Sequence, residues 1–172
     1  SDKIILMGDS AGGGLSTSVA LYNRDNANIK ILGQVLVYPM LDSRTGSESS
    51  LYHAPFAGEI TWNKETNKFA WKNLKGNKEI SNEMIPYFSP AQAQNFSNLP
   101  PTLIYVGDLD LFANENLIYA SKLIEAGVPT ELHLIRGLYH SFDLANPEAQ
   151  QTKEFWNKIH ENINYMLNNS YK

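Results

Sequence analysis

Between Lys3 and Gly14 the chain reads KIILMGDSAGGG, and this stretch decides the fold class. Its apolar first part predicts a buried strand that ends near Met7, and the pattern after residue 10 predicts a helix. Between them stands Gly8-Asp9-Ser10-Ala11-Gly12, which has the form G-x-S-x-G. In this pattern a serine stands on a turn so tight that its oxygen points out of the sheet, where it can act as a nucleophile.

The spacing of this turn has a chemical reason. Gly8 and Gly12 lack the β-carbons that we expect to collide with the neighbouring strand and helix. The helix after the turn directs its free N–H groups and the positive end of its dipole toward the reacting centre. We therefore expect Ser10 to be the nucleophile, the Ala11 N–H to be an oxyanion donor, and Gly8, Asp9 and Gly12 to form the elbow.

A phosphate-binding loop is the rival interpretation of the same glycines. Neither G-x-x-x-x-G-K-[ST] nor G-x-G-x-x-G fits residues 8–18, and no lysine follows in that stretch. The carboxylate of Asp9 would also face an incoming phosphate with like charge. These residues therefore argue against a phosphate site.

Four short apolar runs separated by helical patterns predict an α/β fold. The expected strands span Lys3–Met7, Ile31–Tyr38, Thr102–Val106 and Glu131–Arg136. Poor alternation in the first and third indicates burial on both faces, which is typical of a mostly parallel sheet flanked by helices. Helical spacing predicts three apolar stripes: Leu15, Val19 and Tyr22; Leu117, Ala120, Leu123 and Ile124; and Phe155, Ile159, Ile163 and Met166.

The stretch from Leu41 to Leu99 interrupts this alternation. A structureless loop of that length is improbable in a compact domain, so we expect a helical excursion over the carboxyl ends of the strands, where open parallel sheets bind ligands. We interpret residues 1–172 as one domain, with residues 41–99 as a cap-like segment. Its aromatic residues either line a substrate pocket or only pack the segment against the rest of the domain. These residues are Tyr52, Phe56, Trp62, Phe69 and Trp71.

A serine nucleophile needs a base within hydrogen-bond reach and an acid that holds the base. His140 lies in a glycine-initiated loop just after the fourth expected strand, whereas the other three histidines lie in a strand, a helix or the excursion. Asp108 and Asp110 both follow the third strand, and position alone does not separate them. Serine, acid and histidine therefore occur at one end of the sheet, in the chain order of hydrolases with this elbow.

The composition narrows the classes of partner. The net charge of −4 gives no basic field for nucleic acid or anionic lipid. No apolar run approaches the length of about 18 residues that a membrane span requires. The absence of cysteine excludes disulfides, cysteine nucleophiles and thiolate metal sites, and it fits a reducing cytoplasm. We therefore expect a cytoplasmic protein whose partner is a small molecule.

Six motifs together resemble the catalytic half of the hormone-sensitive-lipase-like esterases, which are α/β-hydrolases. The motifs occur in family order from the first residue to about residue 142: Gly8-Asp9-Ser10-Ala11-Gly12-Gly13, Tyr38-Pro39-Met40-Leu41-Asp42, Ser97-Asn98-Leu99-Pro100-Pro101-Thr102, the segment Asp108 to Glu115, Ala126-Gly127-Val128-Pro129, and Gly137-Leu138-Tyr139-His140-Ser141-Phe142. The resemblance implies Asp110 as the acid, because the family does not use the position of Asp108. It also implies hydrolysis of carboxylic esters with small or medium acyl groups, without cofactor or metal.

The sequence departs from the family in one respect. Members carry an earlier half with a His-Gly-Gly-Gly-type loop that supplies further oxyanion donors, and no such loop occurs here. We therefore expect a fold that is truncated at its N-terminus, slow in turnover, and bare along the outer edge of its first strand, where a second copy could associate. Alternatives are a catalytically impaired fragment, a non-catalytic ligand-binding or assembly module of the same fold, and a peptidase of the same fold.

Overall fold

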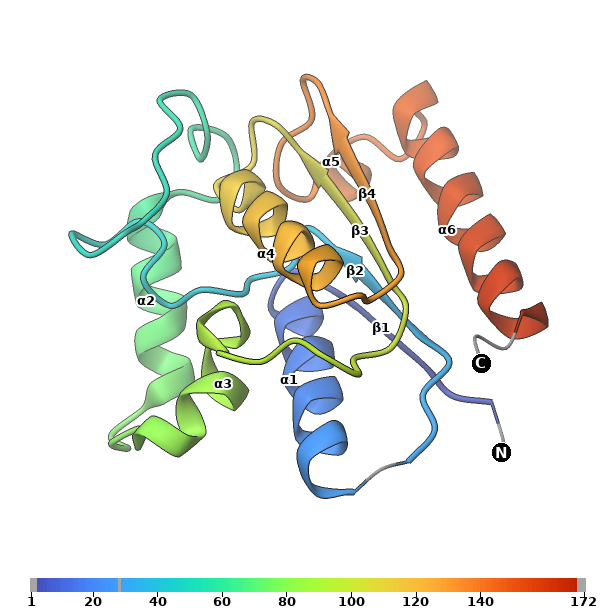
Figure 1. Cartoon of the computed structure of the whole chain (residues 1–172). Helices are drawn as coiled ribbons and strands as arrows, with labels where there is room; N and C mark the ends of the chain where they lie inside the picture. Colours follow the sequence, from blue (N-terminus) through green and yellow to red (C-terminus); the bar gives the residue numbers. More distant parts are fainter. Residues whose placement is uncertain (1–2, 28, 170–172) are drawn as a thin grey trace.

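The structure, a computed structural model, describes residues 3–27 and 29–169 (Figure 1). These residues form one parallel sheet with the strand order β1-β2-β3-β4. The strands are β1 (Ile5–Asp9), β2 (Gly33–Val37), β3 (Thr102–Gly107) and β4 (Thr130–Ile135). The predicted mostly parallel sheet is confirmed, and every predicted strand end lies within two residues of the observed one.

Helices cover both faces of the sheet (Figure 1). α1 (Ala11–Asn26) and α4 (Ala113–Glu125) pack on one face, and α6 (Gln150–Asn168) lies on the other. Leu36 and Ile104 point into the core under α1 and α4, whereas Val35 and Leu103 point into the core under α6. Successive strand residues face opposite sides of a sheet, so β2 and β3 are buried along their whole length.

The register aligns the carboxyl ends of the strands. Asp9 pairs with Val37, Val37 pairs with Tyr105, and Gly107 pairs with Ile135. The turns that leave β1, β3 and β4 therefore reach the same rim of the sheet, which is where the sequence placed the candidate serine, acid and histidine.

The buried side of α1 differs from the predicted one. The exposed residues of this helix include the predicted stripe, and Leu15 is 66% exposed. Its sheet-facing side is made instead of Gly13, Gly14, Ser16, Thr17, Ala20 and Leu21. Small residues are needed there because the helix runs against the loop after β2: a β-carbon on Gly13 would lie 2.7 Å from the Cβ of Pro39. The prediction was wrong because apolar spacing does not report how closely a neighbouring backbone approaches.

The predicted apolar stripes of α4 and α6 agree better with the observed burial. In α4, Ala120 and Leu123 are buried as predicted, but Leu117 and Ile124 are exposed. In α6 the stripe is confirmed: its members pack into the core on that face, three of them buried and Ile163 partly so.

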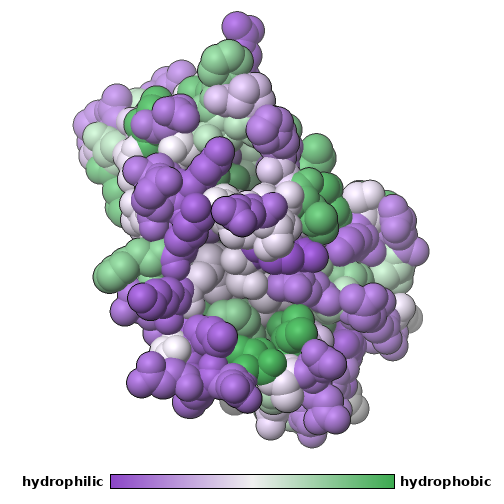
Figure 2. Space-filling model, turned by 90° about the vertical axis from the view of Figure 1, so that its left-hand side faces the viewer, coloured by the Kyte–Doolittle hydropathy of each residue, from purple (hydrophilic) through white to green (hydrophobic). Residues whose placement is uncertain are grey.

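The stretch between β2 and β3 is a helical excursion, as expected. It contains α2 (Lys64–Lys75), the 3-10 helix η1 (Asn82–Met84), α3 (Ile85–Phe88) and the 3-10 helix η2 (Pro90–Gln92). Its first part crosses the rim, where the Gly58 N–H donates to the Leu109 carbonyl at 3.0 Å. α3 then returns beside α1, and the rings of Tyr22 and Tyr87 meet edge to face. Figure 2 shows the side of the molecule on which α2 and α3 lie in Figure 1. This surface is mostly hydrophilic and has separate apolar patches.

After β4 the chain forms a loop and the short α5 (Phe142–Ala145) before α6 begins. No helix in the described part of the chain combines the length and the apolar character that a membrane crossing requires.

Candidate active site

Ser10 stands on a strained turn between β1 and α1. Its backbone angles, φ 52° and ψ −120°, lie in a region that residues with side chains rarely adopt. The Ser10 N–H donates to the Val37 carbonyl at 2.9 Å, and the Ser10 carbonyl accepts from the N–H groups of Gly14 and Met40. These three bonds hold the turn against its strain, so the predicted strand–turn–helix is present.

The glycines around Ser10 do not all have the role expected of them. A β-carbon on Gly8 would collide with the backbone of Gly12 and Gly13, as predicted for a tight elbow. A β-carbon on Gly12 would meet only Asp9 Oδ1, at 3.7 Å, which is an ordinary contact. The expected collision at Gly12 is therefore wrong within the described residues, and the close approach belongs to Gly13 and Gly14, which face the loop after β2.

His140 is brought against Ser10 by the loop after β4. The imidazole is 3% exposed, and its Nε2 lies 2.9 Å from Ser10 Oγ. Its Nδ1 lies 2.8 Å from Asp110 Oδ2. The backbone reaches this position through Gly137 and Ser141, whose φ angles are 80° and 58°. The structure thus places all three predicted side chains in one hydrogen-bonded chain.

The two candidate acids are separated by their contacts. Asp110 is fully buried, and while Oδ2 contacts His140, its Oδ1 accepts the Phe112 N–H at 2.9 Å. Asp108 instead accepts the Gly137 N–H at 2.6 Å and thereby ties the loop of His140 to the end of β3. Asp110 therefore contacts both the imidazole and the turn before α4, whereas Asp108 contacts the backbone of the histidine loop.

The expected oxyanion donor, Ala11, directly follows Ser10. Ala11 is the first residue of α1. The first N–H groups of a helix have no carbonyl acceptor within it, so the Ala11 N–H has none within α1. Asp9, the remaining elbow residue, is exposed.

Most of the chain matches a known protein family. The family model described as alpha/beta hydrolase fold matches residues 1–144.

The chain belongs to the α/β-hydrolase family.

Three similar proteins within this family are an arylesterase, a receptor and a solved esterase. An arylesterase of Saccharolobus solfataricus is 32% identical over 151 residues, which are 87% of this chain and 47% of the arylesterase. The gibberellin receptor GID1A of Arabidopsis thaliana is 31% identical over 148 residues, 83% of this chain and 41% of the receptor. A solved esterase from the bacterial hormone-sensitive lipase family is 26% identical with a TM-score of 0.79, covering 92% of this chain and 51% of that one. The predicted resemblance is confirmed, and the chain spans about half the length of the relatives it matches.

Three aromatic rings lie close to the imidazole of His140. The rings of Tyr38, Phe112 and Trp62 lie 4.7, 5.2 and 5.5 Å from the imidazole, centroid to centroid. The Thr61 hydroxyl donates to the His140 carbonyl at 2.6 Å. Sequence patterns did not assign any of these residues to His140, because the contacts join segments far apart in the chain.

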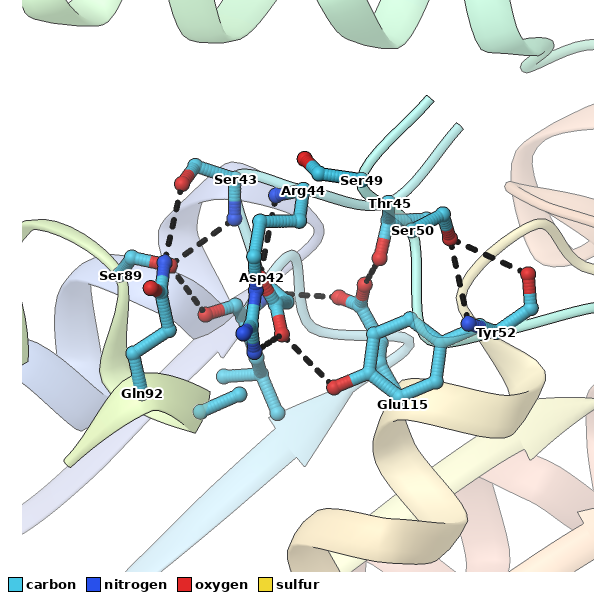
Figure 3. Close-up of polar contacts among 12 residues, drawn as sticks. Asp42, Ser43, Arg44, Thr45, Ser49, Ser50, Tyr52, Ser89, Gln92 and Glu115 are labelled. Atoms are coloured by element: carbon cyan, nitrogen blue, oxygen red, sulfur yellow. Dashed lines mark hydrogen bonds and ion pairs between the residues drawn. The ribbon is translucent and has the colours of Figure 1, made fainter. Parts of the chain in front are cut away.

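A buried acid, Glu115, ties α4 to the start of the excursion (Figure 3). Its carboxyl group accepts the Leu41 N–H at 2.6 Å and the Thr45 hydroxyl proton. Burial raises the pKa of Glu115 well above its usual value, and these two hydrogen bonds oppose the rise without cancelling it. The excursion is therefore anchored by an acid that favours its neutral form.

A second buried acid, Asp42, organises the next turn (Figure 3). It accepts hydrogen bonds from the Arg44 guanidinium at 2.9 and 2.6 Å and from the Tyr52 hydroxyl at 2.7 Å. Burial alone would raise the pKa of Asp42, but these bonds outweigh it and the pKa lies below its usual value. Tyr52 thus helps to hold this turn, and it does not line the pocket beside Ala11 and Gly12 that is described below.

A mostly apolar pocket of about 360 Å³ opens beside Ala11 and Gly12. Of the five aromatic residues named as candidates, Trp71 lines it, whereas Phe56 and Phe69 are 76% and 69% exposed. The remaining lining residues come from α1, α2, α3 and the loop after β2: Gly14, Leu15, Ser18, Met40, Leu74, Tyr87 and Phe88.

Proposed function

We propose that this chain carries the catalytic residues of a serine carboxylesterase. The observation that supports this most directly is the chain of contacts from Ser10 Oγ to His140 Nε2 at 2.9 Å and from His140 Nδ1 to Asp110 Oδ2 at 2.8 Å. These distances suit proton transfer from a nucleophile to a base that an acid orients. The esterases among its relatives support the same reaction class.

In the proposed reaction, Ser10 Oγ attacks the ester carbonyl carbon and its proton passes to His140 Nε2. Asp110 keeps the Nδ1 proton in place and stabilises the imidazolium that forms. The Ala11 N–H donates to the oxyanion of the tetrahedral intermediate. The carbon–oxygen bond to the leaving group then breaks as His140 protonates the departing alcohol. Water, deprotonated by His140, releases the acid from Ser10 by the same steps.

The proposed substrates are carboxylic esters with small or medium acyl groups. The apolar pocket beside Ala11 and Gly12 supports this class, because it offers room for a hydrocarbon group next to the nucleophile. Esters also need less assistance from a general acid than amides, since an alkoxide leaves more readily than an amide anion. We therefore rank esterase above peptidase activity.

Hydrolysis of p-nitrophenyl butyrate, followed at saturating substrate, tests the proposal. The Ser10→Ala variant should lose the activity, whereas Ser121→Ala, which alters an exposed serine on α4, should keep it. A fluorophosphonate probe followed by peptide mass spectrometry should label Ser10. Equal hydrolysis by the parent chain and Ser10→Ala, or label on another residue, would exclude Ser10 as the nucleophile.

A second candidate function is ligand binding without turnover. The similarity to a gibberellin receptor supports it, because that relative is named for binding rather than hydrolysis. A pure binding module has no need for a histidine within 2.9 Å of the serine oxygen, so we place it second. Stoichiometric binding of an ester that is recovered intact, without covalent labelling of Ser10, would favour this function over the esterase.

A further inference from the structure

A buried tyrosine, Tyr38, lies against the imidazole of His140. Tyr38 directly follows β2 and is 1% exposed. The rings of Tyr38 and His140 meet edge to face, with their centroids 4.7 Å apart and their planes at 61°. Tyr38 also has a φ of 35°, which residues with a β-carbon rarely adopt. Backbone strain of this kind persists only where the surroundings enforce it, and it is frequent at functional sites.

The hydroxyl of this tyrosine binds the segment that carries His140. It donates to Asp143 Oδ1 at 2.8 Å, and Asp143 is 8% exposed in the first turn of α5, three residues after His140. α5 is only four residues long, so its own helical bonds contribute little to holding it in place. The bond from Tyr38 therefore ties the carboxyl side of the histidine loop to the end of a central strand.

The protonated state of the Tyr38 hydroxyl keeps this bond in place. Burial and the neighbouring Asp143 carboxylate raise the pKa of Tyr38 far above its usual value, so the phenol stays a donor. A hydrogen bond from a neutral phenol to a carboxylate is among the stronger kinds in proteins. A buried carboxylate that lost this donor would be left without compensation for its lost hydration.

Two different contacts fix the other sides of His140. Asp110 holds Nδ1, and the Thr61 hydroxyl holds the backbone carbonyl. Neither contact restrains the segment after His140, where Ser141 has a left-handed backbone. The Tyr38–Asp143 bond restrains that segment directly.

We propose that Tyr38 and Asp143 form a positioning pair that holds the His140 loop at hydrogen-bond distance from Ser10. This inference rests on the proposed esterase function, to which it adds two residues that act through His140 rather than on the substrate.

The first test is Tyr38→Phe, which keeps the ring against His140 and removes only the hydroxyl, with its bond to Asp143 and its interaction with the Ser141 side chain. We expect kcat for p-nitrophenyl butyrate to fall by about 10- to 100-fold with little change in KM, because a small displacement of the base affects the transition state more than substrate binding. Tyr119→Phe is the matched control: Tyr119 is equally buried, on α4 at the other face of the sheet, and its hydroxyl has no partner among the described residues. It should keep kcat.

Two changes at Asp143 separate the hydrogen bond from simple folding effects. Asp143→Asn keeps an oxygen that can accept the Tyr38 hydroxyl proton, so it should retain most of the rate that Asp143→Ala loses. The double variant Tyr38→Phe/Asp143→Ala should lose no more than the larger single loss, because both changes break one bond. Equal losses for Asp143→Asn and Asp143→Ala, or fully additive losses in the double variant, would overturn the pair.

A readout that needs no turnover separates this inference from the proposed function. The imidazole N–H and C–H resonances of His140, assigned by comparison with His140→Gln, report the ring position in the resting protein. In Tyr38→Phe they should shift or broaden, and in Tyr119→Phe they should not move. Unchanged resonances together with unchanged kcat in Tyr38→Phe would overturn the pair. If the parent chain fails to hydrolyse esters or to label at Ser10, the esterase proposal fails, and the resonances still decide whether the pair positions His140.

Discussion

Asp108 and Asp110 lie two residues apart after β3, and they bind opposite ends of the same loop: Asp110 contacts the His140 imidazole, whereas Asp108 accepts the N–H of Gly137. One carboxylate thus contacts the imidazole of the proposed base, and the other holds the backbone of the loop that carries it. Because the two contacts differ, the same substitution by asparagine should affect kcat differently at Asp108 and at Asp110.

Asp110→Asn should lower kcat by about 1000- to 10,000-fold, because an amide cannot stabilise the imidazolium and can select the wrong tautomer. Asp108→Asn should cost much less, since an amide oxygen still accepts the Gly137 N–H. Steady-state kinetics on p-nitrophenyl butyrate, with circular dichroism to confirm folding, measures both. Comparable losses in the two variants would contradict the separate roles.

Gly8→Ala should damage the elbow, whereas Gly12→Ala should not. A β-carbon at Gly8 collides with the backbone of Gly12 and Gly13, so the turn must open, at a cost of about 1–3 kcal/mol or more in the free energy of unfolding. A β-carbon at Gly12 meets only an ordinary contact, and alanine in a helix costs less conformational entropy than glycine. Urea titration of the two variants gives the comparison, and equal destabilisation would refute it.

Glu115 should make the protein less stable as the pH rises. Its pKa is raised by burial in the folded state, so the folded state binds this proton more tightly than the unfolded state does. Its contribution to the free energy of unfolding is complete below the unfolded pKa, near 4.5, and is lost as the pH rises through the raised pKa. Asp42, with a lowered pKa, contributes in the opposite sense, but its contribution is lost only at lower pH.

Glu115→Gln tests this dependence, because glutamine is neutral and can keep a bond from the Leu41 N–H. Thermal melts from about pH 5 to about pH 9 measure how the melting temperature falls as the pH rises. This fall should be smaller for Glu115→Gln than for the parent chain. Glu125→Gln makes the same change at an exposed position of α4 and should leave the decline as it is. If the melting temperature falls equally with pH in all three proteins, Glu115 does not contribute to the pH dependence.

The outer edge of β1 should promote association of this chain. Among the described residues β1 pairs with β2 alone, and Met7 on β1 and Leu15 on the adjoining helix are both exposed. Unpaired apolar strand edges favour pairing with another chain, and a lysine on the edge discourages it. Met7→Lys should therefore shift the chain toward monomer in light scattering after size exclusion. Leu117→Lys makes the same change on helix α4 rather than on a strand edge, at a side chain of nearly equal exposure (45%), and should do so less. A parent chain that is monomeric at high concentration would contradict this prediction.

Much of the site could be predicted because its parts are marked by local patterns. A strand followed by a glycine-bounded serine, and a histidine in a glycine-initiated loop after another strand, each depend on a few adjacent residues. The choice between Asp108 and Asp110 could not be made that way, since both follow β3 and only the resemblance to a family favoured Asp110. The contacts of Tyr38, Thr61 and Asp143 with the histidine or its loop left no local signal.

The sequence by itself determined the alternation of strands and helices, the tight turn at Ser10 and the chain order of the reactive side chains, because these follow from residue size, backbone freedom and apolar periodicity over short distances. The tertiary structure decided which carboxylate faces His140, which side of α1 is buried, and which residues hold the base in place. Those outcomes depend on how closely separate segments approach one another in space, and apolar spacing along one segment does not encode that distance.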